Sequence, residues 1–386
     1  MQQYRIEFFE NYVSSTTSSR GLRFVHNDFA NDLTVDDDYI ALQTTTIEIR
    51  ATDKVKAGHL IRILRDDTDY FFGLVADAEP GEYTTRISFK PFLAIFDSNI
   101  LFDVRTQRAK GTDGTIVRTG ITLEETLKFY IDGYFVNNDD YKQVYPMSVS
   151  IPELVANRTA DWNMNIQPES DESNLATIGL YNTLIVRAMK EYGVAITVTP
   201  NFSTGQIALE IGKVSGTKHI DADLENVKIK TFKVNDKPNG INKLVIYNTL
   251  TYNDPNDTPI IYYVHPDRSF NTNDVDRITP VAYEIRTVTP SVDEPFNNLA
   301  DNFAYEALST AWEELSGLQF DNLIELEVAP NDPIISPTTM KNGQMVIIHH
   351  NGTAYSSILT GKAVSLEVIT LMFGSERITY TKKTSK

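Results

Sequence analysis

Two stretches of this sequence, far apart in the chain, repeat one pattern of residues. The first is Lys56-Ala57-Gly58-His59-Leu60-Ile61-Arg62-Ile63, followed by Thr68, Tyr70 and Leu74; the second is Lys341-Asn342-Gly343-Gln344-Met345-Val346-Ile347-Ile348, followed by Thr353, Tyr355 and Leu359. Each begins with a glycine and a strand-like run, and each turns back at a polar pair, Asp66-Asp67 or Asn351-Gly352. Because Asn-Gly is the strongest short-range hairpin signal, the pattern predicts a β-hairpin that occurs twice, with the copies in step throughout.

Two interpretations of this repeat stay open. Any two hairpins of similar length share glycine, tyrosine and β-branched residues, so the likeness can be a matter of composition. Alternatively, the chain contains two related β-barrels, because a repeated supersecondary unit is the mark of a repeated architecture. Only the second interpretation places Gly58 and Gly343 in equivalent folds.

The length and composition exclude several classes of protein. The chain has 386 residues, which is enough for two or three domains. It has no cysteine, so disulfides, zinc-thiolate sites, iron-sulfur clusters and cysteine nucleophiles are excluded. The formal net charge of -17 repels nucleic acid and anionic lipid, so a protein that grips DNA is not expected. The same sign of charge suits a protein past which DNA slides without sticking.

The N-terminal start and the apolar runs indicate neither secretion nor membrane insertion. The chain begins with alternating polar and apolar residues, Met1-Gln2-Gln3-Tyr4-Arg5-Ile6-Glu7, so we expect no signal peptide. No apolar run approaches the roughly 20 residues that span a bilayer, so we expect no membrane-spanning segment.

The first 98 residues are predicted to form strands only. The predicted strands cover residues 4–13, 47–51, 60–64, 70–76 and 83–89. Tyr4, Ile6 and Phe8 alternate with Arg5 and Glu7, as a half-buried sheet requires. Short strands with polar turns and no helix predict a small barrel or sandwich.

Three helices are predicted further along the chain, at about residues 122–133, 175–192 and 297–316. Thr122 and Glu125 make a capping-box pattern at the start of the first helix. In the third helix, apolar residues recur every four positions from Leu299 to Leu315, so this helix must pack against a sheet or another helix. A hairpin is predicted at residues 194–211 and a strand at residues 323–328.

Three further segments carry a resemblance. They are Asn239-Gly240-Ile241-Asn242-Lys243-Leu244-Val245-Ile246-Tyr247-Asn248; residues 297–316 with Ile324-Glu325-Leu326-Glu327-Val328; and residues 343–355 and 361–374 with Arg377 and Lys382-Lys383. In order and spacing they resemble the tail-associated (Tal) hub proteins of siphophages of Gram-positive bacteria, of the lactococcal phage type. That family shares its core fold with the baseplate hubs of contractile tails. The first segment looks like the strand that opens the family's second barrel, and the others look like the elements that enter and end its final barrel.

The resemblance implies a role in assembly. It implies a homotrimer with two tube-like barrels per subunit around a channel, so that three copies present six similar barrels to a hexameric ring of distal tail protein. Other baseplate or receptor-binding proteins would be further partners, and phage DNA would pass through without specific binding. The location would be the virion tail tip or baseplate, after synthesis in the host cytoplasm. Because this sequence stops just after Lys382-Lys383, we expect no lytic extension.

The predicted fold class is mainly β with α+β parts. We expect a first small β-barrel in residues 1–98 and a related second barrel in residues 226–270 with 336–386. Peripheral α+β domains would be built from residues 99–225 with 271–335. The expected function is that of a structural hub, not an enzyme, which closes or extends the distal tail tube and opens for DNA during infection.

Two rival functions remain. One is a host-saccharide receptor-binding or carbohydrate-binding module, favoured by the aromatic clusters Phe71-Phe72, Tyr262-Tyr263 and residues 92–96, although packing in a core or an interface is the default explanation of such clusters. The other is a β-rich glycosidase or peptidase that uses scattered carboxylates.

No motif defines a catalytic or cofactor-binding site. The sequence has no GxSxG, Walker, GxGxxG or HExxH pattern. The pairs Glu124-Glu125 and Glu313-Glu314 are adjacent on predicted helices and therefore diverge. His349 and His350 are neighbours on a predicted strand and should face opposite sides of the sheet, so joint metal binding by them is not expected.

Calcium is the one candidate cofactor that the sequence leaves open. Four stretches rich in Asp and Asn offer oxygen ligands: Asp36-Asp37-Asp38; Asp66-Asp67 with Asp69; Asn253-Asp254 with Asn256-Asp257; and Asn273-Asp274 with Asp276. None has the spacing of an EF-hand loop. Turns in which Asp and Asn bond their own backbone explain these stretches equally well.

Overall fold

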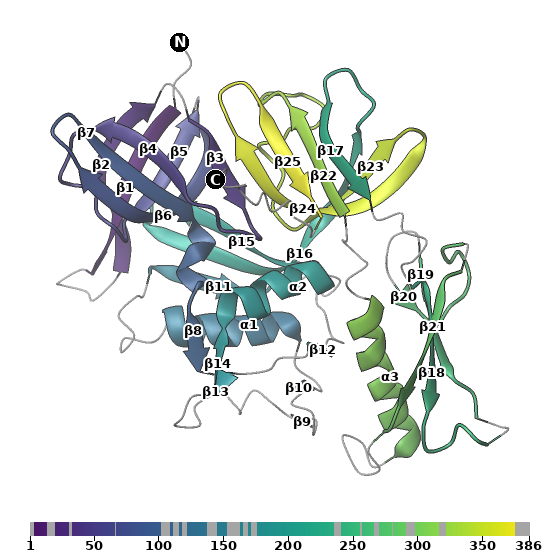
Figure 1. The fold of residues 1–386 in the computed structure, drawn as a ribbon. Helices are drawn as coiled ribbons and strands as arrows, with labels where there is room; N and C mark the ends of the chain where they lie inside the picture. The colour runs from purple at the N-terminus through teal and green to yellow at the C-terminus, as the bar shows by residue number, and fades with distance from the viewer. Residues whose placement is uncertain are drawn as a thin grey trace, which may run out of the picture.

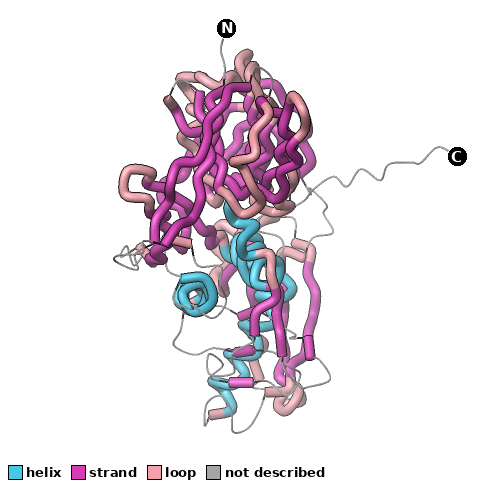
Figure 2. Tube along the Cα trace, turned by 90° about the vertical axis from the view of Figure 1, so that its left-hand side faces the viewer, coloured by secondary structure: helices cyan, strands magenta, loops and turns pink. Residues whose placement is uncertain are grey.

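The protein is mainly β with α+β parts, as predicted. The computed structural model describes residues 4–13, 20–30, 33–65, 67–101, 109–110, 116–117, 122–136, 145–152, 163–164, 169–170, 176–234, 241–254, 257–265, 270–279, 281–290, 298–315 and 322–374. Figure 1 shows two curled sheets side by side, a layer of helices and strands beneath them, and a helix packed on a separate sheet. In Figure 2 the curled sheets lie at one end and most helical residues lie below them.

The first curled sheet is built from the N-terminal strands. Its order is β2-β1-β5-β6-β7-β4. The strands are β1 (Tyr4–Val13), β2 (Arg20–Ala30), β4 (Thr45–Arg50), β5 (Leu60–Arg65), β6 (Thr68–Pro80) and β7 (Thr84–Pro91). Alternate residues point inward, so Ile47 and Ile49 of β4 are buried while Glu48 between them is exposed. The sequence predicts no strand at β2, because its apolar residues do not alternate regularly.

Asp28 bridges the two outer strands of this sheet. Its carboxylate in β2 accepts a hydrogen bond from the backbone N–H of Arg50 in β4 at 2.7 Å, and another from the Arg50 Nε at 3.0 Å. The outer strands therefore approach one another through a side chain, without a shared backbone ladder among the described pairs. A fully closed barrel stays a prediction.

The second curled sheet has nine strands and collects residues from along the whole chain. Its main order is β11-β16-β23-β24-β25-β22-β17, with β15 paired to β16 and β3 paired to β24. The strands are β3 (Val35–Asp38), β11 (Met147–Ser150), β15 (Val194–Asn201), β16 (Gln206–Asp221), β17 (Lys228–Val234), β22 (Asn322–Val328), β23 (Gln344–His350), β24 (Thr353–Val364) and β25 (Ile369–Phe373). The first half of β16 belongs to the helical layer, and its second half pairs in parallel with β23.

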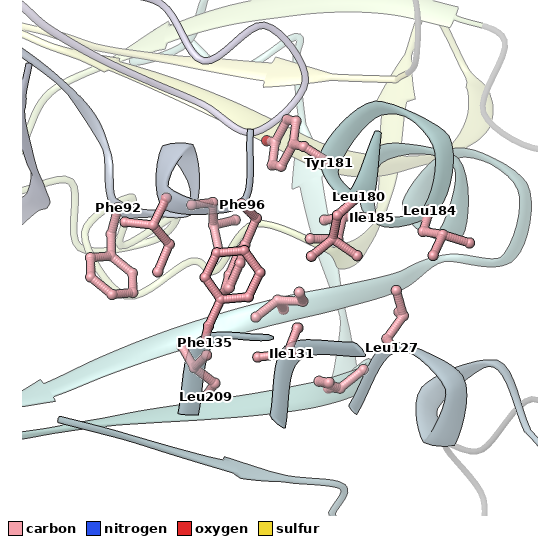
Figure 3. Packing of buried hydrophobic residues seen from close by; sticks show 14 of the residues in the cluster. Phe92, Phe96, Leu127, Ile131, Phe135, Leu180, Tyr181, Leu184, Ile185 and Leu209 are labelled. Carbon is pink, nitrogen blue, oxygen red and sulfur yellow. The ribbon is translucent and has the colours of Figure 1, made fainter. Parts of the chain in front are cut away.

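The helical layer packs under the two curled sheets (Figure 1). It contains α1 (Leu123–Ile131), a π-helical turn at Asp132–Val136, a second π-helical turn at Leu180–Ile185, α2 (Val186–Tyr192) and a 3-10 helix at Phe92–Phe96. The predicted capping box is present, because the Thr122 side chain accepts from the Glu125 N–H and the Glu125 side chain accepts from the Thr122 N–H. Figure 3 shows the shared core, in which Phe96 of the 3-10 helix packs against Phe135 of the first π-helical turn.

A separate core forms where α3 (Leu299–Leu315) packs on a four-stranded sheet of order β20-β19-β18-β21. The strands are β18 (Lys243–Asn248), β19 (Ile260–Val264), β20 (Phe270–Asn271) and β21 (Tyr283–Val288). Ala307 and Ala311 of α3 are fully buried against Leu244 and Ile246 of β18. The prediction that this helix packs against a sheet is confirmed.

Two small sheets complete the described structure. One joins β8 (Asn99–Leu101), β13 (Glu169–Ser170) and β14 (Ala176–Gly179); the other joins β9 (Ala109–Lys110), β10 (Ile116–Val117) and β12 (Asn163–Met164). The predicted second helix, at residues 175–192, is therefore shorter than expected, because β14 occupies its first residues.

The strand pairing differs from the predicted grouping of residues 226–270 with 336–386. Among the described residues of 226–270, β17 lies in the second curled sheet, whereas β18 and β19 lie under α3. Residues 241–248, the described part of the segment that the resemblance places at the start of a second barrel, therefore belong to the sheet under α3. Conversely, β22 lies within residues 271–335 but pairs with β25 and β17. The reason is long range: β18 and β22 have equally apolar patterns, and only packing against α3 separates them.

We expect Asp28→Ala to lower the free energy of unfolding by about 1–3 kcal/mol at neutral pH, because the part-buried Arg50 N–H loses its acceptor. Burial by itself would raise the pKa of the Asp28 carboxyl, but the bonds from Arg50 and Phe29 lower it below its ordinary value. A carboxyl with a lowered folded-state pKa stabilises the fold above its unfolded pKa, and this contribution disappears as the pH falls through the folded pKa.

Thermal unfolding of the wild-type, Asp28→Ala and Asp53→Ala proteins across the acid range checks this prediction. Asp53 is exposed and serves as the matched control. The loss of melting temperature in Asp28→Ala, relative to the wild type, should be largest at neutral pH and should become smaller in acid. Equal melting temperatures at neutral pH would contradict the bridging role.

Candidate functional site: the joint between two related β units

The two repeated glycines occupy equivalent backbone positions. Gly58 and Gly343 have φ values of 86° and 89°, in the left-handed region that glycine adopts without strain. The Gly58 N–H donates to the Val75 carbonyl at 2.9 Å, and the Gly343 N–H donates to the Leu359 carbonyl at 2.7 Å. Each glycine thus ties the start of its hairpin to the far part of the return strand. Both lie in the same local fold, as the interpretation of two related units requires.

The hairpin tips also agree, but the register does not stay in step. Above the tip, a bulge between Ile63 and Leu64 interrupts the first hairpin only. Tyr70 lies in this bulge and outside the ladder, whereas Tyr355 pairs with Ile348. The prediction that the two copies stay in register throughout is therefore wrong. Beyond the bulge the pairing of the first hairpin is shifted by one residue relative to the second, because a bulge adds a residue to one strand of a pair.

The likeness extends to the next strand of each sheet. A bulge follows Val75 in β6, and an equivalent bulge follows Leu359 in β24. Val75 then pairs with Phe89 of β7, and Leu359 pairs with Phe373 of β25. Both phenylalanines are fully buried.

A fourth strand completes each unit in the same place. β4 pairs antiparallel with β7, and β22 pairs antiparallel with β25, so the spatial orders β5-β6-β7-β4 and β23-β24-β25-β22 correspond. We call β4 to β7 the first unit and β22 to β25 the second unit. The order of the four strands along the chain is also the same in both units. Similar composition alone does not explain a shared order, shared turns and a shared bulge.

The two repeated glycines differ in the space around them, so we expect alanine to destabilise the protein more at Gly343 than at Gly58. We expect Gly58→Ala to cost about 1–2 kcal/mol, because an L residue is strained at this φ and an added Cβ meets nothing within 4 Å. At Gly343 an added Cβ would lie 2.3 Å from the Ala195 Cβ. Overpacking of this kind costs about 1–3 kcal/mol more.

Urea unfolding of the two single variants measures this difference directly. Each glycine variant is the control for the other, because both carry the same backbone strain. Equal losses of stability in Gly58→Ala and Gly343→Ala would contradict the tight contact at Gly343.

The two units are joined by a strand of the N-terminal segment. β3 pairs antiparallel with the second half of β24, from Val35 opposite Val364 to Asp38 opposite Gly361. The pairing continues in the bond from the Tyr39 N–H to the Thr360 carbonyl at 3.0 Å. The backbones approach closely here, because a Cβ on Gly361 would lie 3.1 Å from the Asp38 Cα. Glycine at this position therefore permits the joint.

Two side chains of the first sheet reach the turn that follows β24. The Tyr4 hydroxyl donates to the Ser365 carbonyl at 2.7 Å, and the Arg65 guanidinium donates to the Leu366 carbonyl at 2.7 Å. Arg65 is 9% exposed. Burial raises the pKa of the Tyr4 hydroxyl, against a smaller lowering by the Arg65 charge, so Tyr4 remains a neutral donor at physiological pH. These bonds fix the second unit against the first.

Charged residues line the β3 ladder. Asp37 lies opposite Lys362, whose ammonium donates to the Met340 carbonyl at 3.0 Å. Burial raises the pKa of Asp37, and the Lys362 charge opposes this rise. Burial likewise lowers the pKa of Lys362, and Asp37 opposes that change. The Asp36-Asp37-Asp38 stretch is thus part of a paired strand.

We expect Asp36→Asn to stabilise the protein at neutral pH. Burial raises the pKa of Asp36, as does the neighbouring Asp38, while Lys230 lowers it. An acid whose folded-state pKa is raised binds its proton more tightly in the folded state, so its ionised form destabilises the fold above that pKa. The gain from Asp36→Asn should vanish below the ordinary Asp pKa of about 3.9.

The check is to measure melting temperatures of the wild-type, Asp36→Asn and Asp53→Asn proteins from neutral pH down to below the ordinary Asp pKa. Asp53→Asn, at an exposed position, should change little at any pH. A lower melting temperature for Asp36→Asn at neutral pH would show that the carboxylate is better satisfied than its burial indicates.

The Asp67 and Asp69 candidates are already paired with arginines. Asp67 lies 3.1 Å from Arg5, and Asp69 accepts from the Arg62 guanidinium at 3.1 Å. Asp66 lies outside the described residues. A calcium ion at this tip would have to displace two arginines.

The remaining calcium candidates form turns. The Asn273 side chain accepts from the Val275 N–H at 3.0 Å, and the Asp257 N–H donates to the Asp254 carbonyl at 2.9 Å. Asp274 lies 3.8 Å from Arg277. Asn256 lies outside the described residues. Asn253 and Asp276 lie in turns of the same two segments. The Asn273 bond is that of an Asx turn, whereas the bond between Asp257 and Asp254 is an ordinary backbone turn.

The side chains of Glu124 and Glu125 have separate surroundings, and the pair Glu313-Glu314 is described only in part. Glu124 is buried and Glu125 caps the start of α1. Glu314 accepts from the Arg286 guanidinium at 2.8 Å. The side chain of Glu313 lies outside the described residues.

The histidine neighbours on β23 make different contacts. The His350 ring lies 2.6 Å from Asp223 and 4.5 Å from the centre of the Phe232 ring. The His349 ring contacts His219 of β16 instead. The two side chains therefore do not share a ligand, and His219 has no sequence signal that links it to His349.

Most of the aromatic candidates for saccharide binding are core residues. Phe71, Phe92, Phe96 and Tyr262 are buried, and Phe72 stacks on Phe92 with ring centres 5.1 Å apart. Tyr263 is half-buried and contacts the charges of Lys243 and Arg277. Burial raises the pKa of Tyr262 to about 12, as expected for a core hydroxyl.

Among the residues that the structure describes, no helix is both long and apolar enough to cross a membrane. Within the same ranges, no three His, Cys, Asp or Glu side chains gather closely enough to hold a metal ion. Sequence reasoning missed the joint residues Arg65 and Lys362 and the strand β3. An acidic four-residue strand gives no β signal, because Asp is disfavoured in strands.

No protein-family model matches this sequence, and no curated protein matches it. Three solved structures show a partial likeness. The tail protein from Neisseria meningitidis MC58 has a TM-score of 0.47 and 12% identity, with 96% of each chain covered. The 43 kDa tail protein of prophage MuSo2 from Shewanella oneidensis has a TM-score of 0.47 and 14% identity, with 96% of this chain and 98% of that chain covered.

The third likeness is to a chain of the phage P2 baseplate in its activated conformation with Ca, with a TM-score of 0.46, 12% identity, and 98% and 100% of the two chains covered. All three are tail or baseplate proteins by name. At these TM-scores and identities, the likeness does not establish the family of this chain.

Proposed function

We propose that this protein is a structural hub subunit of a phage tail tip or baseplate, of the Tal type found in siphophages. In this proposal it closes or extends the distal tail tube and opens for DNA passage during infection. The observation that carries the proposal is the pair of equivalent four-stranded units, joined through β3, in one chain. A binding module or an enzyme needs only one site. A trimeric subunit that binds a hexameric ring, by contrast, gains from two related surfaces per chain, because three chains then offer six.

The duplicated unit supports a homotrimer. Three copies contain six units, which suits a hexameric ring of distal tail protein on one side and other baseplate or receptor-binding proteins on the other. Within one chain, neighbouring units meet where β3 covers the second half of β24. By equivalence, the corresponding edge of the first unit is the stretch of β6 from Asp77 to Pro80. We place the next copy at this edge.

The edge from Asp77 to Pro80 differs from its counterpart in one respect. The Ala78 N–H donates to its neighbour's Asp77 side chain at 2.9 Å, and Pro80 has no N–H. Proline and charged residues of this kind prevent strand addition at a sheet edge. The contact between copies therefore uses side chains, such as the exposed Asp77 and Glu79, and not a continuous backbone ladder.

The charge supports DNA passage without binding. Each chain carries a formal charge of -17, and three copies around a channel would repel phosphates at close range. Location at the virion tail follows from the same proposal, with synthesis in the host cytoplasm. The rival saccharide-binding function loses most of its support, because the aromatic clusters that favoured it are largely core residues.

Light scattering on the purified chain, alone and mixed with the distal tail protein, tests the proposal. We expect the chain to form a trimer, either alone or after mixing. The trimer alone would have about three times the 43.5 kDa chain mass, and the mixed particle would contain three copies of this chain. The double variant Asp77→Lys, Glu79→Lys should shift the particle toward the monomer, because it reverses charge at the proposed contact.

The control is Asp53→Lys, which changes an exposed carboxylate in the connection between β4 and β5. It should leave the trimer intact. A monomer under both conditions would sink the hub proposal, and tight binding of host saccharide by that monomer would favour the rival. Loss of trimer in the control as well would sink the assignment of the contact to the Asp77 edge.

A further inference from the structure

Two histidines from distant parts of the chain meet on the second curled sheet. His219 lies in the second half of β16, and His349 lies near the end of β23, which pairs with it in parallel. The Nδ1 atom of His219 is 3.3 Å from the Nε2 atom of His349. Both side chains are exposed, so the pair is open to solvent in the single chain.

The rings meet by their nitrogen-bearing edges. Their centres are 5.7 Å apart, much farther than the two nitrogens, and their planes differ by 17°. The two nitrogens therefore lie in nearly one plane and face one another. Two ligands of a tetrahedral zinc ion, each about 2.0–2.1 Å from the metal, are about 3.3–3.4 Å apart. The observed separation equals that of two imidazole ligands of one ion.

We propose that His219 and His349 form a binding site for a divalent transition-metal ion such as Zn²⁺ or Cu²⁺. Metal binding would replace the hydrogen bond between the two rings. The bridging proton would move to the far nitrogen of its ring, and both rings would turn until their free lone pairs point at one ion, with water in the remaining positions. Imidazole suits these metals, whereas Ca²⁺ and Mg²⁺ prefer oxygen ligands. The site is distinct from every calcium candidate in the sequence.

The surroundings define the site as a two-histidine site. Asp221 lies opposite His349 in the ladder, but its Oδ1 accepts from the Asp223 N–H at 3.0 Å. His350 follows His349 but makes its contacts with Asp223 and Phe232. Neither residue adds a ligand in the present arrangement. The ion would therefore be held by two protein nitrogens.

The position of the pair gives the metal a structural effect. β16 starts in the helical layer, where it pairs with β15, and continues into the second curled sheet beside β23. An ion held by His219 and His349 would cross-link β16 and β23, two neighbouring strands of the second curled sheet. A ligand that binds only the folded state raises its stability in proportion to occupancy.

Calorimetric titration of the metal-free full chain with Zn²⁺ alone, and separately with Cu²⁺ alone, tests the proposal. We expect one ion per chain, a higher melting temperature with metal, and no competition from Ca²⁺. His219→Ala and His349→Ala should each weaken binding by about ten-fold or more, because one imidazole loses the advantage of a linked second ligand.

His350→Ala and His265→Ala are the matched controls, since each removes a histidine outside the pair. They should leave the affinity unchanged. Because His219 and His349 are exposed, their variants should melt like the wild type without metal, and this measurement excludes misfolding as a cause. Wild-type affinity in His219→Ala, or equal weakening in His350→Ala, would overturn the proposal. The state of assembly is measured separately, so the metal site and the hub function stand or fall independently.

Discussion

The pairing of β3 with β24 is the contact on which the arrangement of the two curled sheets depends. A strand that leaves the first sheet completes the edge of the second, so the backbone itself links the two related units. An uncovered edge would offer unpaired N–H and C=O groups to other chains. The close approach at Gly361 and the bonds from Tyr4 and Arg65 hold this pairing in one geometry.

The residue after β3 extends this constraint to the helical layer. The Tyr39 hydroxyl accepts from the Ile196 N–H at 3.0 Å, and its carbonyl accepts from the Tyr181 hydroxyl. Burial raises the pKa values of both hydroxyls well above the ordinary tyrosine value, so both remain neutral hydrogen-bonding groups. The segment from Val35 to Tyr39 therefore bonds both to β24 of the second curled sheet and to Tyr181 and Ile196 of the helical layer.

The two units are related but not interchangeable. The second unit receives a strand along β24, where Gly361 and small side chains allow it, while the first unit carries Asp77, Glu79 and Pro80 at the corresponding edge. In the proposed trimer, the edge of the second unit is covered by β3 of the same chain, whereas the edge of the first unit contacts another copy. The two edges therefore differ although the units are related. The fold thus combines a repeated surface with a directed order of contacts, as the proposed hub function requires.

The sequence by itself determined the features set by local pattern. The alternation in β1, the capping box at Thr122, the stripe on α3 and the repeated hairpin all follow from residues close together in the chain. Tertiary structure alone decided the partners of the strands, because β3 is too acidic to read as a strand and β18 is as apolar as β22. The joint at Lys362 and the contact of His219 with His349 likewise depend on groups far apart in sequence, whose approach only packing and backbone pairing set.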